Sequence, residues 1–270
     1  MTGLLISIRD DQEATLASQF PIGIIDVKEP DRGALGCADK SELWRIVARL
    51  GDDVVKSVAL GELRDRIDGP GFGCALASES ADANEVVRPH SDGELISHFR
   101  FAKIGLAGAL RIEHWQQHWL VFANSLPTGV QPVGVAYLDH ERCGSPSPAE
   151  VMELIKCQSN GAMLVDTFDK SSGDAVSLWG FEKIKNLVIR ARQKSISIVV
   201  AGSIKESHLF ELIKCEPDFV GVRGAVCNGG RSKLDAERLN SFCNSFNAAM
   251  AELSESGTKN RQMENQSVVK

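Results

Sequence analysis

The sequence lacks the features that mark several common classes of protein. No apolar run approaches the length of a membrane-spanning helix, and no long run of lysine or arginine occurs. The formal net charge is -6 at pH 7, which argues against nucleic acid or an anionic membrane as the main partner. Residues 1–10 become charged too early for a signal peptide, so we expect a cytoplasmic protein.

The cysteine pattern argues against disulfides and against a structural zinc site. The seven cysteines are odd in number, scattered along the chain and without a CxxC pair. This distribution predicts reduced thiols rather than disulfides or a structural zinc site. With 43% hydrophobic and 24% charged residues, the composition is that of a globular protein with an ample core.

What the sequence does contain is a regular alternation of two kinds of segment. Short apolar runs, each followed by polar or glycine-bearing residues and then by a helical period, cover residues 4–8, 22–28, 54–60, 101–106, 132–138, 162–167, 197–201 and 219–223. Alternating strands and helices predict a parallel sheet, and eight such units predict closure into a single (β/α)₈ TIM barrel of the α/β class. We expect this catalytic domain to occupy residues 1–253.

Two regions depart from this regular pattern. Residues 61–90 are rich in glycine, with at most one short helix near residues 74–84; they fit an active-site lid or a surface excursion, and we favour the excursion. Residues 254–270 are polar and lack apolar periodicity, which predicts a disordered tail.

The second apolar run ends in a carboxylate and an amine. Side chains alternate along a strand, so Asp26 and Lys28 share one face with Ile22 and Ile24. The turn at Glu29 and Pro30 places the pair at the carboxyl end of the strand, where α/β folds carry their chemistry. A desolvated lysine becomes a nucleophile toward carbonyls, and a nearby carboxylate can carry the protons that imine formation needs. A structural ion pair is the alternative.

Further charged residues occupy equivalent positions on other strands. Lys103 lies on a strand where Gly105 leaves room above it, Asp166 ends another strand, and Lys170 follows in the turn. If these side chains surround one cavity with Lys28, repulsion and desolvation depress the pKa of at least one amine. We therefore expect a Schiff-base centre with aspartates as proton carriers; the alternative is lysines that extend into solvent.

A second group of residues suggests a phosphate site. Barrels of this kind often bind phosphate with the loops after strands seven and eight, through backbone N–H groups. The small residues Gly202, Ser203 and Gly224 allow a close approach there, while Arg223 and Arg231 can both face an anion. Tight turns alone would also explain the small residues. Together with the lysines, the loops predict a phosphorylated carbonyl substrate.

These residues lie in motifs that resemble a known family. The motifs are Asp26-Val27-Lys28-Glu29-Pro30-Asp31-Arg32-Gly33-Ala34-Leu35-Gly36, Val58-Ala59-Leu60-Gly61-Glu62-Leu63, Lys103-Ile104-Gly105-Leu106, Val165-Asp166-Thr167-Phe168-Asp169-Lys170 and Gly221-Val222-Arg223-Gly224-Ala225-Val226-Cys227. Over residues 4 to 245 they look like those of the (5-formylfuran-3-yl)methyl phosphate synthases, also called 4-(hydroxymethyl)-2-furancarboxaldehyde-phosphate synthases. The 61–90 region and the polar tail resemble bacterial more than archaeal members.

The resemblance implies a TIM-barrel lyase of methanofuran-type cofactor biosynthesis. Such an enzyme condenses two molecules of glyceraldehyde 3-phosphate into (5-formylfuran-3-yl)methyl phosphate, with release of phosphate and water and without a metal or organic cofactor. Lys28 would form the Schiff base, with Asp26, Lys103, Asp166 and Lys170 at the other active-site positions. The partner is a small phosphorylated triose, and a homo-oligomer is possible. A class I aldolase for triose phosphate and a noncatalytic phosphometabolite-binding barrel are the alternatives.

Overall fold

The computed structural model describes residues 1–67, 92–156 and 161–267. Eight parallel strands pair in chain order and close on themselves, because β1 pairs with both β2 and β8. The strands are β1 (Gly3–Ile8), β2 (Ile24–Val27), β3 (Lys56–Glu62), β4 (Phe101–Gly105), β5 (Gln131–Tyr137), β6 (Ala162–Asp166), β7 (Ser197–Val200) and β8 (Phe219–Val222). The predicted (β/α)₈ barrel is therefore confirmed.

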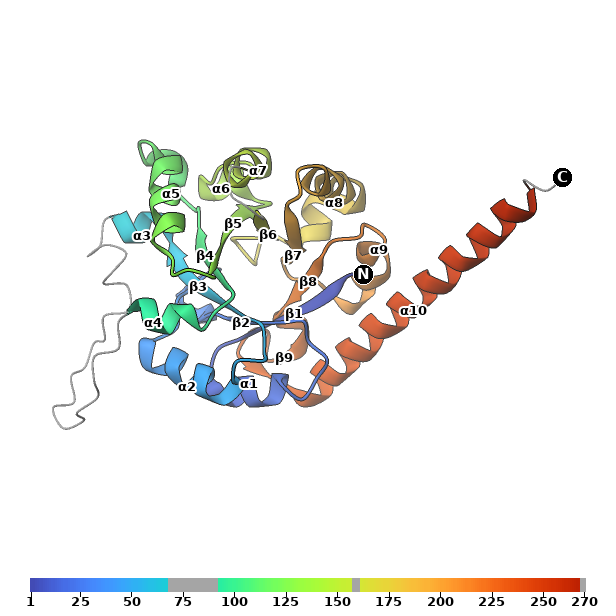
Figure 1. Cartoon of the computed structure of the whole chain (residues 1–270), viewed down its shortest axis with the longest axis horizontal. Helices are drawn as coiled ribbons and strands as arrows, with labels where there is room; N and C mark the ends of the chain where they lie inside the picture. Colours follow the sequence, from blue (N-terminus) through green and yellow to red (C-terminus); the bar gives the residue numbers. More distant parts are fainter. Residues whose placement is uncertain (68–91, 157–160, 268–270) are drawn as a thin grey trace.

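Helices surround the strands (Figure 1). They are α1 (Asp11–Ala17), α2 (Lys40–Leu50), α3 (Leu63–Ile67), α4 (Asp92–Ser97), α5 (Trp115–Ser125), α6 (His140–Cys143), α7 (Pro148–Ile155), α8 (Ala175–Gln193), α9 (Leu209–Ile213) and α10 (Ala236–Ser267), with the short 3₁₀ turns η1 (Pro30–Arg32), η2 (Ala109–Arg111), η3 (Glu206–His208) and η4 (Gly224–Val226). A two-stranded hairpin, β9 (Cys227–Asn228) and β10 (Lys233–Leu234), follows β8.

Three serines stand where the sequence predicts that helices begin, namely Ser41, Ser147 and Ser203, and serine is a favoured N-cap residue. Ser147 caps α7 in a full capping box with Glu150, and Pro148 occupies the first turn, as the sequence predicts. Helix α2 instead begins at Lys40, after Asp39, so Ser41 lies inside the helix. Ser203 is not a cap either, because the turn η3 begins only after Lys205.

The core has two layers, as strand alternation requires. One set of apolar side chains fills the barrel interior, among them Val133, Val135 and Leu164. The larger set packs between the strands and the surrounding helices and includes Trp119 and Phe242, both fully buried. The interior is therefore a packed core whose upper end carries the polar side chains described below.

The predicted domain boundary and disordered tail remain predictions. Helix α10 runs from Ala236 to Ser267 and so passes through the proposed boundary at residue 253. It extends away from the barrel toward the C-terminus (Figure 1). The region of residues 61–90, assigned to a surface excursion, lies mostly outside the described residues, as does its short helix.

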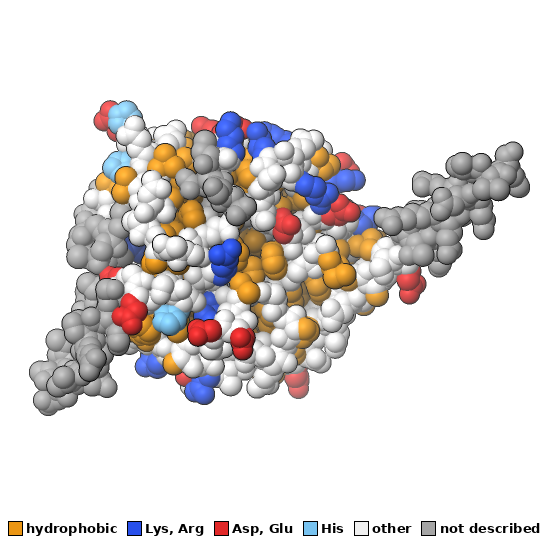
Figure 2. All heavy atoms as spheres, viewed as in Figure 1, with side chains coloured by type: hydrophobic (Ala, Val, Ile, Leu, Met, Phe, Trp, Pro, Cys, Tyr) orange, Lys and Arg blue, Asp and Glu red, His pale blue; other side chains and the backbone are white. Residues whose placement is uncertain are grey.

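The described surface agrees with the charge pattern of the sequence. No helix in the described part of the chain is long and apolar enough to cross a membrane. On the face seen in Figure 2, lysine and arginine side chains lie interspersed with acidic ones rather than gathered in one extended patch.

Candidate active site

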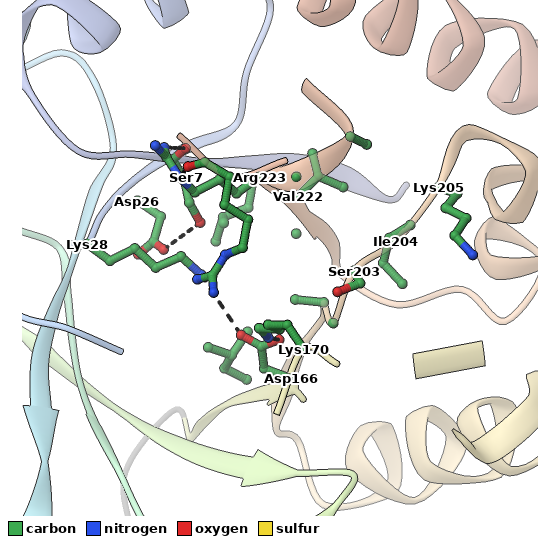
Figure 3. A pocket seen from close by; sticks show the side chains of 18 of the residues that line it. Ser7, Asp26, Lys28, Asp166, Lys170, Ser203, Ile204, Lys205, Val222 and Arg223 are labelled. Carbon is green, nitrogen blue, oxygen red and sulfur yellow. Dashed lines mark hydrogen bonds and ion pairs between the residues drawn. The ribbon is translucent and has the colours of Figure 1, made fainter. Parts of the chain in front are cut away.

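A cavity of about 400 Å³ opens at the carboxyl ends of the strands (Figure 3). Its volume lies in the range that holds small-molecule ligands. Polar lining comes from β1, β2, β4 and β6 and from the loops after β6, β7 and β8: Ser7, Asp26, Lys28, Lys103, Asp166, Lys170, Ser203, Lys205, Arg223 and Arg231. All five predicted catalytic residues therefore lie around one cavity.

Asp26 and Lys103 form one of two acid–amine pairs in this cavity. The Lys103 ammonium donates directly to Asp26 Oδ1, and Ser7 Oγ donates to Asp26 Oδ2 at 3.0 Å. Both charged groups are buried, with 1% and 2% of their surfaces exposed. Burial alone would raise the pKa of Asp26, but Lys103 and then Lys28 hold it below its ordinary value. Asp26 is thus a carboxylate.

This pairing corrects the one that the sequence suggests. Asp26 and Lys28 were interpreted as a possible ion pair, yet the partner of Asp26 is Lys103 from β4. Two residues on the same face of a strand are separated by about 6.5 Å along the strand, because the rise per residue is about 3.3 Å. A residue on another inward-facing strand can come closer, and here it does.

Asp166 and Lys170 form the second pair. Lys170 donates to Asp166 Oδ1, and the backbone N–H of Thr167 donates to the same oxygen at 2.7 Å. Burial would raise the pKa of Asp166, while Lys170 and Lys28 lower it below its ordinary value. The turn that carries Lys170 is held by Asp139, whose carboxylate accepts the N–H groups of Phe168 and Asp169 at 2.7 and 2.8 Å. Asp139 follows β5, where the sequence allows either a role in proton transfer or ordinary loop polarity, and in the structure it orders this loop.

Lys28 lies between the two pairs and belongs to neither. Its closest carboxylate oxygen is Asp166 Oδ2, 3.9 Å from Nζ (Figure 3), and only 7% of the residue is exposed. Burial lowers the pKa of Lys28 to about 8; Asp166 opposes this shift, whereas Lys170 adds to it. A lysine with a pKa of about 8 is neutral in a substantial fraction of molecules near neutral pH, and the neutral amine is the nucleophilic form.

Three of the four predicted phosphate-binding residues, Gly202, Ser203 and Gly224, line the cavity as small residues in the loops after β7 and β8. Gly202 has φ = +100°, and a Cβ there would come within 3.0 Å of Thr167 Cγ2. Ser203 is exposed and also has a positive φ of 54°. Gly224 opens the turn η4, and in the described part of the chain neither its N–H nor that of Ser203 has a backbone acceptor. These amides are free to donate to an anion.

Arg223 has a different environment from the one that the sequence suggests. Its guanidinium forms a buried ion pair with Glu13 at 2.8 Å and also donates to the carbonyls of Ser7, Arg231 and Ser232 at 3.0 to 3.1 Å. All of its nitrogen atoms have acceptors. The geometry therefore argues against Arg223 as a direct phosphate ligand and makes it a support for the β8 loop. The sequence did not single out Glu13, because it lies on α1 and its partner Arg223 is 210 residues away.

A second buried group was also missed. Glu62, at the end of β3, accepts hydrogen bonds from the Tyr137 hydroxyl at 2.7 Å and the Ala107 N–H at 2.9 Å. A Cβ on Gly105 would clash with this carboxylate. The space above Lys103 that the small Gly105 provides is thus occupied by Glu62. Burial raises the pKas of both Glu62 and Tyr137.

A closed parallel barrel has two close acid–amine pairs at its mouth and a third lysine that makes only a long contact to a carboxylate. These features define a class: TIM-barrel proteins with a lysine-centred candidate active site. The sequence comparisons name the family. A profile of the 4-HFC-P synthases matches residues 4–243, so the chain belongs to the 4-HFC-P synthase family. This confirms the resemblance drawn from the motifs.

The relatives agree with this assignment. A (5-formylfuran-3-yl)methyl phosphate synthase of Methanothermobacter thermautotrophicus is 27% identical over 229 residues, covering 84% of this chain and 90% of the relative. A protein of Methylorubrum extorquens, described as a candidate for the same synthase, is 29% identical over 238 residues, covering 87% and 88%. Among solved structures, phosphoribosyl anthranilate isomerase of Thermus thermophilus superposes with a TM-score of 0.54 at 15% identity, covering 94% of this chain and all of that chain. That likeness shows the fold alone.

Proposed function

We propose that this protein is a lyase that joins two molecules of glyceraldehyde 3-phosphate into (5-formylfuran-3-yl)methyl phosphate, with release of phosphate and water, for the biosynthesis of a methanofuran-type cofactor. Family membership supports the product. The observation that carries the mechanism is the contrast among three lysines that line one cavity. Lys103 and Lys170 donate directly to carboxylates, while Lys28 has only a long contact of 3.9 Å to Asp166 and its pKa is lowered to about 8.

The proposed chemistry begins at Lys28. Its neutral amine attacks the aldehyde carbon of one triose, and loss of the carbonyl oxygen as water leaves an iminium ion. The iminium withdraws electrons from the neighbouring carbon, so a base can remove that carbon's proton. The resulting electron pair expels phosphate from the next carbon. Aldol joining to the second triose, ring closure and dehydration complete the furan, and release from Lys28 regenerates the amine.

Asp166 is the best-placed proton carrier for these steps. It is the carboxylate nearest to Lys28 Nζ, at 3.9 Å, and is kept ionised by Lys170. Asp26 faces the same cavity but is already bound by Lys103 and Ser7. We therefore assign Asp26 and Lys103 to holding the electrostatic field around Lys28, and Asp166 with Lys170 to proton transfer.

The test is trapping combined with identification of the product. Borohydride added with glyceraldehyde 3-phosphate should reduce the imine and leave a stable mass increase on a peptide that contains Lys28. Without borohydride, the same substrate should yield inorganic phosphate and a conjugated furan aldehyde detected by its absorbance and mass. An unchanged protein mass would refute the imine mechanism.

The same experiment separates the alternatives. A class I aldolase would give the Lys28 adduct but release an acyclic sugar phosphate. A noncatalytic phosphometabolite-binding barrel would bind the triose without an adduct and without phosphate release.

A further inference from the structure

Arg231 is the charged residue of the cavity whose role remains unexplained. It follows Gly229 and Gly230, which have φ values of +64° and +81°, in the turn between β9 and β10. It lines the same cavity as Lys28 and Asp166 and packs over the turn η4, because a Cβ on Gly224 would lie 3.8 Å from Arg231 Cγ. The side chain thus reaches the cavity from the loop after β8.

The guanidinium of Arg231 has no protein partner in the described ranges. Its Nη2 atom is buried without a hydrogen-bond acceptor, and no carboxylate of these residues lies within 4.0 Å of the side chain. The two acidic residues with the strongest influence on it, Asp166 and Asp31, are already paired with Lys170 and Arg9. A partly buried cation without an anion is unfavourable unless a ligand supplies one.

Apart from Lys28, whose nearest carboxylate oxygen is 3.9 Å away, the remaining cations of the cavity have close carboxylate partners. Lys205 pairs with Asp174 at 2.7 Å, Arg223 pairs with Glu13, and Lys103 and Lys170 pair with the two catalytic aspartates. Arg231 therefore gives the mouth of the cavity a positive charge that the described residues do not balance. A planar guanidinium with several N–H groups matches the oxygen atoms of a phosphate group especially well.

We propose that Arg231 is the side chain that binds the phosphate group of the substrate, together with the backbone N–H groups of Ser203 and Gly224. The proposal rests on the proposed function in that it takes the substrate to be a sugar phosphate. Of the two arginines that the sequence suggested could face an anion, it makes Arg231 the direct ligand and Arg223 its support. Arg223 positions the loop that carries Arg231, because its guanidinium donates hydrogen bonds to the carbonyl oxygens of Arg231 and Ser232 at 3.0 and 3.1 Å.

The test uses sn-glycerol 3-phosphate, which has the phosphate of the triose but no carbonyl and so binds without imine chemistry. Calorimetric titration should show binding to the wild-type protein that is about tenfold or more weakened in Arg231→Gln, because a charge-assisted hydrogen bond is lost. Arg231→Lys should restore part of the affinity, since it keeps the charge but not the fork of donors. Lys233→Gln, an exposed position on the same hairpin, should bind as the wild type does.

A second measurement connects the residue to the phosphate group itself. Borohydride trapping at Lys28 should be compared for glyceraldehyde 3-phosphate and for glyceraldehyde, which lacks phosphate. Arg231→Gln should raise the half-saturating concentration of the phosphorylated aldehyde by about tenfold and leave that of glyceraldehyde unchanged.

The outcomes separate the two proposals. Equal affinity of wild type and Arg231→Gln for sn-glycerol 3-phosphate would overturn the role of Arg231, as would equal weakening of trapping with both aldehydes. If the wild type binds sn-glycerol 3-phosphate through Arg231 but neither aldehyde forms an adduct, the phosphate assignment stands and the imine mechanism fails.

Discussion

The two ends of the barrel each contain a buried lysine, and the comparison shows how the surroundings of a structural amine differ from those of the proposed nucleophile. At the amino end, Lys56 begins β3 with 2% of its surface exposed, and Nζ donates to the backbone carbonyls of Gly51 and Val54. At the carboxyl end, Lys28 is nearly as buried, with 7% exposed. Burial lowers the pKa of both lysines.

What differs is the set of neighbours. Lys56 donates hydrogen bonds to backbone carbonyl oxygens, which do not act as bases and so cannot transfer its proton. Lys28 faces a cavity, two carboxylates and two other ammonium groups, and none of these contacts its nitrogen directly. Both lysines are therefore desolvated. They differ because Lys28 faces a cavity and has a carboxylate nearby that can transfer protons, whereas the amine of Lys56 is held by hydrogen bonds.

The largest expected effect comes from removing the reactive amine. Lys28→Met preserves length and apolar packing but has no nucleophile, so turnover should fall by about three orders of magnitude or more. Steady-state phosphate release and borohydride trapping measure the loss. Activity within tenfold of the wild type would show that Lys28 is not the imine-forming residue.

A smaller effect is expected from the proton carrier. Asp166→Asn keeps the shape of the side chain but cannot take up a proton, so turnover should fall by about 100-fold. The Lys28 adduct should still form, because loss of the carboxylate favours the neutral amine. Thermal unfolding of the variant must be recorded alongside, since Lys170 loses its buried partner. Equal loss of trapping and turnover would assign Asp166 to binding or folding rather than to proton transfer.

The pH dependence of trapping should follow Lys28. Below a pKa of about 8 the fraction of neutral amine rises about tenfold per pH unit, and above it the rate should level off. Replacing Lys170 with Met removes a cation that lowers this pKa, so the profile should shift to higher pH. A profile that keeps rising to pH 10 would contradict the lowered pKa.

The smallest effect on activity is expected at the opposite end of the barrel. Lys56→Met removes hydrogen bonds to two carbonyls without touching the cavity, so the rate of turnover should change by less than about twofold. The free energy of unfolding should fall by about 1–3 kcal/mol, because buried carbonyl oxygens lose their donor. Urea unfolding measures this change in free energy. If Lys56→Met also lost borohydride trapping, Lys56 would not be a purely structural amine.

Strand alternation was sufficient to predict the barrel and the inward direction of Asp26, Lys28, Lys103 and Asp166. It could not predict which amine pairs with which carboxylate. Pairing depends on distances between β2, β4 and β6, which are separated by many residues in the sequence but brought together by the barrel. The period-two pattern describes the residues of one strand, so it cannot predict which side chains of different strands touch across the barrel interior.

The role of Arg223 shows the same limit at a loop. An arginine at the end of a strand beside glycine fits an anion ligand, and only the position of α1 reveals that Glu13 already accepts its hydrogen bonds. Helix α1 spans Asp11–Ala17, and a local pattern there cannot show that Glu13 contacts a residue 210 positions later. The partner that decides the role of Arg223 was therefore not visible in the sequence.

The contact between Glu13 and Arg223 also has a consequence for how the protein folds. The two residues are 210 positions apart, and Glu13 additionally accepts the N–H of Leu234 at 2.9 Å. A chain still emerging from the ribosome has Glu13 long before it has either partner. This part of the cavity mouth is therefore completed only when the loop after β8 docks against α1, so the surroundings of Lys28 depend on contacts between the two ends of the barrel sequence.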